Sequence, residues 1–247
     1  VIPLHVVNAA IDRYKQQCHY FDPKGNQHDC EFPWSELDGP LVLGIDPARF
    51  GDDETVIYAV RGKKVIACAT LYQQDGNAVA DRAMQMVNML RRGPVDNPVE
   101  IRIDATGGVG ASPIDALAHV PLGIRVVPIT VSERANDPER FVNRRAELWF
   151  GLRDWLEKGG MIPDDNRLAS ELATPTYAFN DGAKGRMQVE AKEIFKRRLK
   201  RSPDRADALA LAVCGHDDDV YTVAHIERNT RQRAATGYRF GTSGRGF

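Results

Sequence analysis

Two aspartates are the last residues of apolar, β-type segments of the chain. Asp46 ends the run LVLGID and Asp104 ends the run EIRID. In an open α/β sheet, neighbouring parallel strands present such residues side by side at one edge, where ligands bind. Two carboxylates there repel each other unless a cation neutralises them, and hard oxygen ligands suit Mg²⁺ or Mn²⁺. The pair therefore predicts a divalent-metal site at the edge of a sheet.

The phrase SPDRADALALA, which starts at Ser202, supplies candidates for a third carboxylate. Asp204 and Asp207 are three positions apart, so they share a face of a predicted helix. Asp204 falls in the first helical turn, where the helix dipole stabilises an acid. Asp207 lies deeper, among alanines that let the helix approach the sheet, and an unpaired carboxylate there is costly. We expect Asp207 to be the third metal ligand, with Asp204 as a supporting or alternate ligand.

Each acid also has a purely structural interpretation. A lone aspartate at a strand end more often starts a turn or caps a helix, and Asp204 alone could simply serve the helix N-terminus. Asp52, Asp53 and Glu54 are interpreted as part of a solvated loop. Two strand-end acids and one helix acid, in the order that this architecture requires, favour the metal site.

A basic run precedes the third acid directly. Placed beside the metals, its charges would neutralise DNA phosphates. For any single member, a solvated helix face is the alternative. The run consists of Lys192, Lys196, Arg197, Arg198, Lys200 and Arg201.

The elements that must position these residues follow from apolar spacing. The strand-like runs are residues 41–46, 55–60, 65–72, 100–104 and 124–129. The first three are joined by short polar turns and predict an antiparallel meander. The fourth and fifth follow helices, so they pair in parallel through right-handed crossovers. The sequence thus predicts an α/β domain with a mixed five-stranded sheet in the order 3-2-1-4-5, flanked by helices.

Helical periodicity marks the flanking elements. The predicted helices span residues 7–14, 78–91, 113–118, 141–156, 167–172 and 203–214. Residues 176–179 and 186–189 flank Asn180-Asp181-Gly182 and predict a further hairpin. Trp149 and Trp155 are spaced as core residues of their helix rather than as a platform for stacked bases.

Composition narrows the class of protein. The chain has 247 residues, 43% of them hydrophobic, and a formal net charge of −1. No apolar stretch reaches the length that spans a bilayer, so no membrane partner is expected. The charge is not that of a basic body that grips DNA unaided. The four cysteines form no regular framework, which indicates reduced thiols.

Two further motifs have weaker functional interpretations. Cys18-His19 with His28 and Cys30 could form a zinc site, but the spacing matches no standard zinc module. The glycine loop from Gly107 to Gly110 lacks the P-loop lysine and the dinucleotide-binding spacing. We expect the former to be a polar loop and the latter to let backbone or DNA approach Asp104.

Taken together, three segments match a known family. GPLVLGIDPARFGDDETVIYAVRGKKV, IRIDATGGVGASPIDAL and KRSPDRADALALA, in this order, resemble the C-terminal nuclease domain of large terminase subunits of tailed bacteriophages. The preceding IPLHVVNAAIDRY is similar to the segment that links their ATPase domain to the nuclease. The resemblance covers roughly residues 1–215.

The resemblance implies an RNase H-like fold and a two-metal-ion endonuclease that uses Mg²⁺ or Mn²⁺ to cut concatemeric viral double-stranded DNA during packaging. Asp46, Asp104 and Asp207 match the family's metal ligands. The implied partners are DNA, the portal protein, the small terminase subunit and an ATPase domain of the same polypeptide, with no P-loop in this chain. The implied location is the host cell cytoplasm, at the procapsid portal.

The resemblance also suggests a division of the chain. Residues 1–40 are expected to be a linker helix and loop leading from the ATPase domain, residues 41–219 the RNase H-like nuclease domain, and residues 220–247 a basic, flexible tail.

Other functions remain open at this point. A Holliday-junction resolvase or a transposase-like nuclease would share the fold and metal chemistry, and is the main alternative. An actin-like or sugar-kinase ATPase also opens with a GID-type turn, but needs a duplicated domain that this chain lacks. A degenerate module that only docks on a portal or on DNA would not need the complete set of acids.

Overall fold

The central sheet has the order that the sequence predicts. The computed structural model describes residues 1–17, 39–48, 54–92, 96, 98–108, 110–180 and 185–213. The strands are β1 (Leu41–Asp46), β2 (Glu54–Arg61), β3 (Lys64–Tyr72), β4 (Val99–Asp104) and β5 (Ile124–Ile129). They form a five-stranded sheet in the order β3-β2-β1-β4-β5. β1 is antiparallel to β2 and β2 to β3, whereas β1 pairs with β4, and β4 with β5, in parallel.

The register of the parallel pair brings two candidate ligands to one edge. Ile45 on β1 faces Ile103 on β4, so the following residues, Asp46 and Asp104, leave the sheet at neighbouring positions. This is the placement expected for the carboxyl ends of parallel strands.

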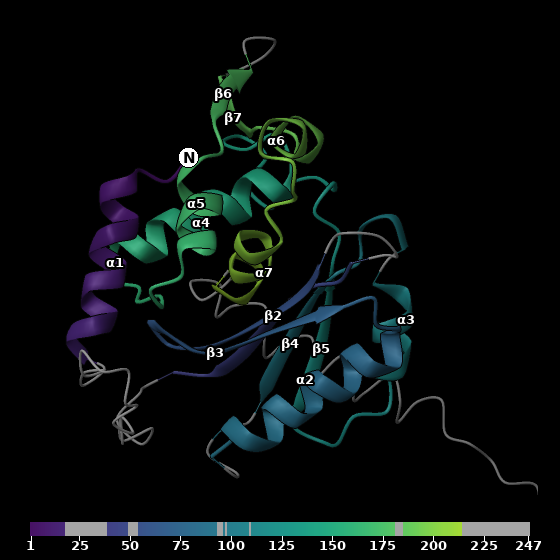
Figure 1. The fold of residues 1–247 in the computed structure, drawn as a ribbon. Helices are drawn as coiled ribbons and strands as arrows, with labels where there is room; N and C mark the ends of the chain where they lie inside the picture. Colours follow the sequence, from purple (N-terminus) through teal and green to yellow (C-terminus); the bar gives the residue numbers. More distant parts are fainter. Residues whose placement is uncertain are drawn as a thin grey trace, which may run out of the picture. The chain divides into compact units, whose positions relative to one another are not determined.

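Helices cover both faces of the sheet (Figure 1). α2 (Gly76–Leu90) and α3 (Ala111–Ala116) pack on one face, over the apolar side chains of β1 and β4. The other face is covered by α1 (Leu4–Gln17), α4 (Arg144–Glu157), α5 (Asn166–Ala173) and α7 (Asp204–Val213). Successive side chains of a strand point to opposite faces of the sheet, so β2 contributes to the core on each face. Ile57 belongs to the first core, on the side of α2 and α3, and Tyr58 belongs to the second core, on the side of α1, α4, α5 and α7.

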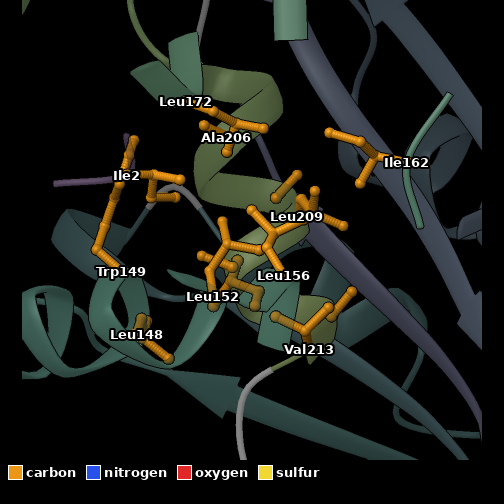
Figure 2. Close-up of a cluster of buried hydrophobic side chains, with 14 of the residues drawn as sticks. Ile2, Leu148, Trp149, Leu152, Leu156, Ile162, Leu172, Ala206, Leu209 and Val213 are labelled. Carbon is orange, nitrogen blue, oxygen red and sulfur yellow. The ribbon is translucent and has the colours of Figure 1, made fainter. Parts of the chain in front are cut away.

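The second core joins segments that are far apart in the sequence. Figure 2 shows Ile2, which precedes α1, beside Trp149 and Leu152 of α4 and Leu209 of α7. The N-terminal helix is therefore packed against the same core as the helix that carries Asp207. The assignment of residues 1–40 to a separate linker stays a prediction.

α7 lies unusually close to the sheet. A Cβ atom placed on Gly44 of β1 would lie 2.2 Å from the backbone oxygen of Ala208 and 2.4 Å from the backbone nitrogen of Ala212. Only a glycine in the strand and alanines in the helix permit this approach. The contact fixes where the N-terminal end of α7, with its two aspartates, meets the end of β1.

Several element boundaries differ from the sequence prediction. α4 starts at Arg144 rather than at residue 141, because Asn143 has an extended backbone and its side chain accepts a hydrogen bond from the backbone N–H of Ala146. The predicted hairpin is present as β6 (Tyr177–Asn180) and β7 (Arg186–Val189). Part of the basic run forms α6 (Lys192–Leu199), an element that periodicity alone did not reveal.

Some predictions fall outside the described residues. They include the weak zinc candidate of residues 18–30, the interpretation of Asp52 and Asp53 as part of a solvated loop, and the basic tail of residues 220–247. Within the described ranges, no helix combines the length and apolar character needed to cross a bilayer.

A candidate metal centre at the sheet edge

All four candidate carboxylates line one pocket. The pocket has a volume of about 450 Å³ and lies where β1, β4, α6 and α7 meet. The ends of β1 and β4 contribute Asp46 and Asp104, and the first turn of α7 contributes Asp204 and Asp207. Two strands and one helix thus bring together residues from three separate segments of the sequence, as the sequence predicts.

The ammonium group of Lys192 lies among three of these carboxylates. Lys192 Nζ is 3.1 Å from Asp46 Oδ2. It is 3.3 Å from Asp204 Oδ1 and 3.3 Å from Asp207 Oδ2. A single positive charge thus marks the point on which three carboxylate oxygens converge.

The electrostatics of Asp46 indicate an excess of negative charge. Burial raises the pKa of Asp46 well above its usual range, and the charges of Asp207, Asp204 and Asp104 raise it further, against the opposite effect of Lys192. Burial alone would lower the pKa of Lys192, but the surrounding carboxylates hold it well above its usual value. Since one ammonium does not balance the acids around it, the pocket favours additional positive charge.

Asp207 is held more firmly than its neighbours. Its Oδ1 accepts a hydrogen bond from the indole Nε1 of Trp149 at 2.8 Å and one from Arg145 at 3.4 Å. Burial would raise the pKa of Asp207, but Arg145, Lys192 and Trp149 lower it below its usual value. Asp207 is therefore a fixed, charged carboxylate.

The glycine loop supports Asp104 through backbone contacts. Asp104 Oδ1 accepts a hydrogen bond from the backbone N–H of Thr106 at 2.8 Å. Gly107 and Gly108 both have positive φ, a conformation that glycine adopts without strain. A Cβ on Gly110 would lie 2.2 Å from the carbonyl oxygen of Asp104. The loop thus folds back onto the end of β4, close to the pocket.

Glu171 binds backbone N–H groups at the N-terminus of α7. The buried Glu171 carboxylate accepts hydrogen bonds from the backbone N–H of Arg205 at 2.9 Å and of Ala206 at 3.2 Å. Burial raises the pKa of Glu171 to about 7, and these bonds together with Arg167 act against the rise. Asp204 lies in the first turn of α7, as the sequence predicts, and also faces Lys192.

A second ion network anchors the same end of α7. Arg205 donates to Glu54 Oε1 at 3.1 Å, and Arg167 lies 2.8 Å from the same oxygen. Arg205 also pairs with Asp165, the N-cap of α5. Glu54 is only 1% exposed, so the sequence interpretation of this residue as part of a solvated loop is wrong. Its buried carboxylate instead ties β2 to α5 and α7.

The basic run divides into one inward and several outward residues. Lys192 reaches into the pocket, whereas Lys196, Arg197 and Lys200 are exposed. Arg198 is also exposed and pairs with Glu190 at 2.7 Å. Arg201 is half-buried. Only the outward members are placed to meet a ligand on the surface.

Sequence reasoning missed the contacts that Trp149, Arg145, Glu171 and Lys192 make with the two acidic residues or the backbone of α7. Trp149 is spaced as a core residue and is one, with 0% exposure. Its indole N–H and the Glu171 carboxylate act on residues about 60 and 35 positions away, through contacts for which the sequence contains no local signal.

The carboxylates of the pocket suit a hard divalent cation, although the ammonium of Lys192 stands between three of them. Mg²⁺ and Mn²⁺ prefer carboxylate oxygens, and here four carboxylates face one pocket. Within the described ranges, no group of three or more histidine, cysteine, aspartate or glutamate side chains is drawn close enough to hold an ion as it stands.

Solved structures share this fold. No family model and no curated protein matches the chain. The nuclease domain of the large terminase subunit of bacterial virus Sf6 matches with a TM-score of 0.63 and 20% identity, over 86% of this chain and 97% of that domain. A mutant of that domain with manganese and beta-thujaplicinol matches with a TM-score of 0.63 and 21% identity over the same shares.

A nuclease from a second virus gives a weaker match of the same kind. The large terminase nuclease from thermophilic phage G20c matches with a TM-score of 0.51 and 19% identity, over 71% of this chain and 81% of that one. The predicted RNase H-like fold, with its mixed sheet in the order 3-2-1-4-5, is confirmed. The resemblance to terminase nuclease domains is thereby confirmed at the level of the fold.

Proposed function

We propose that the protein is a metal-dependent endonuclease that cuts concatemeric viral double-stranded DNA during genome packaging. The observation that carries this proposal is the meeting of Asp46, Asp104, Asp204 and Asp207 in one pocket at the sheet edge. The fold, which solved terminase nucleases share, supports the same function. The proposed setting is the infected host's cytoplasm, in a motor with portal protein, small terminase subunit and an ATPase domain of the same polypeptide.

Asp46, Asp104 and Asp207 are the proposed ligands of two Mg²⁺ or Mn²⁺ ions, and Asp204 is the supporting or alternate ligand. Structures of the Sf6 domain were solved with manganese and with calcium, which supports a divalent cation here. When bound, such ions activate a water and stabilise the leaving oxygen of the phosphodiester.

The chain's own residues prepare the site in two ways. Lys192 neutralises part of the charge of Asp46, Asp204 and Asp207, which lets these carboxylates approach one another before a metal arrives. A divalent cation held by these carboxylates would take over this neutralisation, and the flexible side chain of Lys192 could then leave the central position. The exposed residues Lys196, Arg197 and Lys200 on and beside α6 neutralise phosphates of the bound DNA.

The experiment is plasmid cleavage with and without divalent metal. We expect Mg²⁺ or Mn²⁺ to support linearisation and degradation, and a chelator to stop both. Asp46→Asn and Asp104→Asn should abolish cutting and leave the unfolding temperature equal or higher, because removal of one carboxylate relieves repulsion in the pocket. Asp81→Asn is the matched control, since Asp81 is exposed on α2 and does not line the pocket.

Two results would contradict the proposal. Undiminished cutting in chelator would exclude the metal mechanism. Full activity of the Asp104→Asn protein would remove that residue from the ligand set.

A further inference from the structure

The two oxygens of Asp207 have different partners. Oδ1 accepts from Trp149 Nε1 at 2.8 Å and from Arg145 at 3.4 Å, both on α4. Oδ2 faces Lys192 Nζ at 3.3 Å, beside the oxygens of Asp46 and Asp204. One oxygen is therefore held by the protein, and the other is presented to the point at which the carboxylates converge.

Trp149 is suited to hold this carboxylate because its ring is enclosed in the core. The side chain is 0% exposed and belongs to the core in Figure 2, with Leu152 and Leu209 nearby. The guanidinium of Arg145 lies 5.5 Å from the centre of its ring. Both the packing and this contact fix the direction in which the indole N–H points.

An indole N–H differs from the charged donors in the pocket. It donates one hydrogen bond, accepts none and carries no charge. Trp149 can thus orient Asp207 without neutralising it, whereas Arg145 and Lys192 each compensate part of the negative charge that a cation needs. The donor with the shortest hydrogen bond to Asp207 Oδ1 is the uncharged one.

We propose that Trp149 is a positioning residue that presents Asp207 Oδ2 to the divalent cation; the inference rests on the proposed function. Groups that hydrogen-bond to metal ligands restrict their orientation, and loss of such a partner typically weakens metal binding about 10- to 100-fold. Without the indole N–H, the carboxylate of Asp207 is free to turn towards Arg145, and metal binding must restore its orientation.

A purely structural role makes a different prediction. A buried indole N–H needs an acceptor for stability alone. In that case, removal of the N–H would change the stability of the fold but not the affinity of the pocket for metal. Metal affinity, measured without DNA, therefore separates the two roles.

The test compares two tryptophans on the same helix. Trp149→Phe keeps an aromatic ring in the core and removes the N–H. Trp155→Phe is the matched control, because Trp155 Nε1 donates to the carbonyl of Gly62 at 3.1 Å and Trp155 does not line the pocket. Mn²⁺ is titrated into the full chain by calorimetry. We expect the Kd to rise about 10-fold or more for Trp149→Phe and to stay within about twofold for Trp155→Phe.

If the Trp149→Phe variant does not fold, the inference can still be tested on the unaltered protein by NMR. In ¹⁵N-labelled protein, the indole N–H signal of Trp149 should shift as Mg²⁺ is added, while that of Trp155 stays in place. The signals are assigned from the spectra of Trp155→Phe and Trp34→Phe.

The outcomes separate this inference from the proposed function. Normal Mn²⁺ affinity in a folded Trp149→Phe protein, or an indole signal of Trp149 that ignores Mg²⁺, overturns the positioning role alone. If the unaltered protein binds no Mn²⁺, or if Asp46→Asn leaves that binding intact, the proposed metal site fails and the inference fails with it.

Discussion

At the scale of single residues, charge balance in the pocket is the main feature. Three carboxylates share one ammonium, that of Lys192, and the pKa of Asp46 is raised by burial and by the other acids. Arg145, which lies 3.4 Å from Asp207, adds a second positive charge, but four carboxylates still outnumber the two cations, so the pocket favours a further one. Lys192 thus occupies the point on which three of the acids converge.

The third ligand can be assigned by comparing Asp207→Ala with Asp204→Ala. We expect Asp207→Ala to eliminate DNA cleavage, because Asp207 is the carboxylate that Trp149 and Arg145 hold in place. Asp204→Ala should reduce cleavage only in part. Because Glu171 also accepts from two backbone N–H groups at this end of α7, Asp204→Ala should change stability by less than about 1 kcal/mol. Plasmid cleavage and urea unfolding measure the two effects.

The opposite pattern would reverse the assignment. If Asp204→Ala abolishes cutting and Asp207→Ala does not, Asp204 coordinates the metal and the indole of Trp149 serves the fold alone.

A second residue-scale prediction concerns the buried pair of Arg61 and Asp96. Both are almost fully buried, with exposures of 1% and 3%. Burial would raise the pKa of Asp96, but hydrogen bonds from Arg61 and from the backbone of Arg92 hold it at about 2. Because this folded-state pKa lies below the ordinary value of 3.8, the stabilisation is present above pH 3.8 and is lost as the pH falls through about 2.

Asp96→Asn should therefore be strongly destabilising at neutral pH. It leaves the Arg61 charge buried without its carboxylate, a change that costs about 3 kcal/mol or more. Urea unfolding of both proteins between pH 7 and pH 2.5 measures the difference, which should shrink below about pH 4 because Asp96 becomes protonated in the unfolded chain before it does so in the folded protein. A difference that is equal at pH 7 and at pH 2.5 would contradict the assigned pKa.

Residue types and spacing predicted which carboxylates would meet, but not what surrounds them. Asp46 and Asp104 follow strands whose apolar character is readable in the sequence, so their neighbourhood follows from strand order. The contacts of Lys192 and Trp149 with Asp207 depend on how α6 and α4 are oriented over the sheet. That orientation results from packing between segments that are far apart in the sequence, and local sequence patterns do not predict such packing.

At the scale of elements, the closeness of α7 to β1 positions the site. Gly44→Ala should destabilise the protein by about 3 kcal/mol, because the added methyl group meets backbone atoms of Ala208 and Ala212 that cannot move without displacing the helix. Unfolding in urea measures this loss. We also expect cleavage by the folded fraction to fall, since displacement of α7 moves Asp204 and Asp207.

Gly151→Ala is the matched control for this prediction. Gly151 lies inside α4, and a Cβ there would find no atom within 4 Å. The substitution should stabilise the protein by up to about 1 kcal/mol, because alanine favours the helix. Equal effects of the two substitutions would show that the close approach of α7 is not what constrains Gly44.

Elements with strong apolar signals were predicted well. β1 and β5 have the predicted bounds, and the order of the sheet is as expected. The start of α4 was placed too early because Phe141 and Val142 continue the apolar pattern, whereas Asn143 ends it through a side-chain cap. α6 has only one buried residue, Phe195, so its periodicity is too weak to mark a helix.

At the scale of the whole molecule, the net charge is nearly zero. The formal charge of −1 predicts weak binding to duplex DNA by the isolated chain, with affinity carried by local basic residues and lost steeply as salt rises. Replacing Lys196, Arg197 and Lys200 together by glutamate should weaken binding and make its salt dependence shallower. Fluorescence anisotropy with labelled duplex at several salt concentrations measures both effects.

A control with the same change in net charge separates local from global effects. Lys15, Lys63 and Lys158 are exposed and do not line the pocket, so their joint replacement by glutamate should weaken binding much less. Equal losses in the two triple variants would mean that α6 has no special part in holding DNA.

The central claim is that Asp46, Asp104 and Asp207 hold the metal ions with which the protein cuts DNA. The most direct measurement is the anomalous diffraction of a crystal soaked in Mn²⁺. We expect anomalous peaks in the pocket at about 2.2 Å from oxygens of Asp46, Asp104 and Asp207, with Lys192 moved from its central position. Mn²⁺ peaks elsewhere in the molecule, with an undisturbed Lys192 between the carboxylates at a saturating Mn²⁺ concentration, would contradict it.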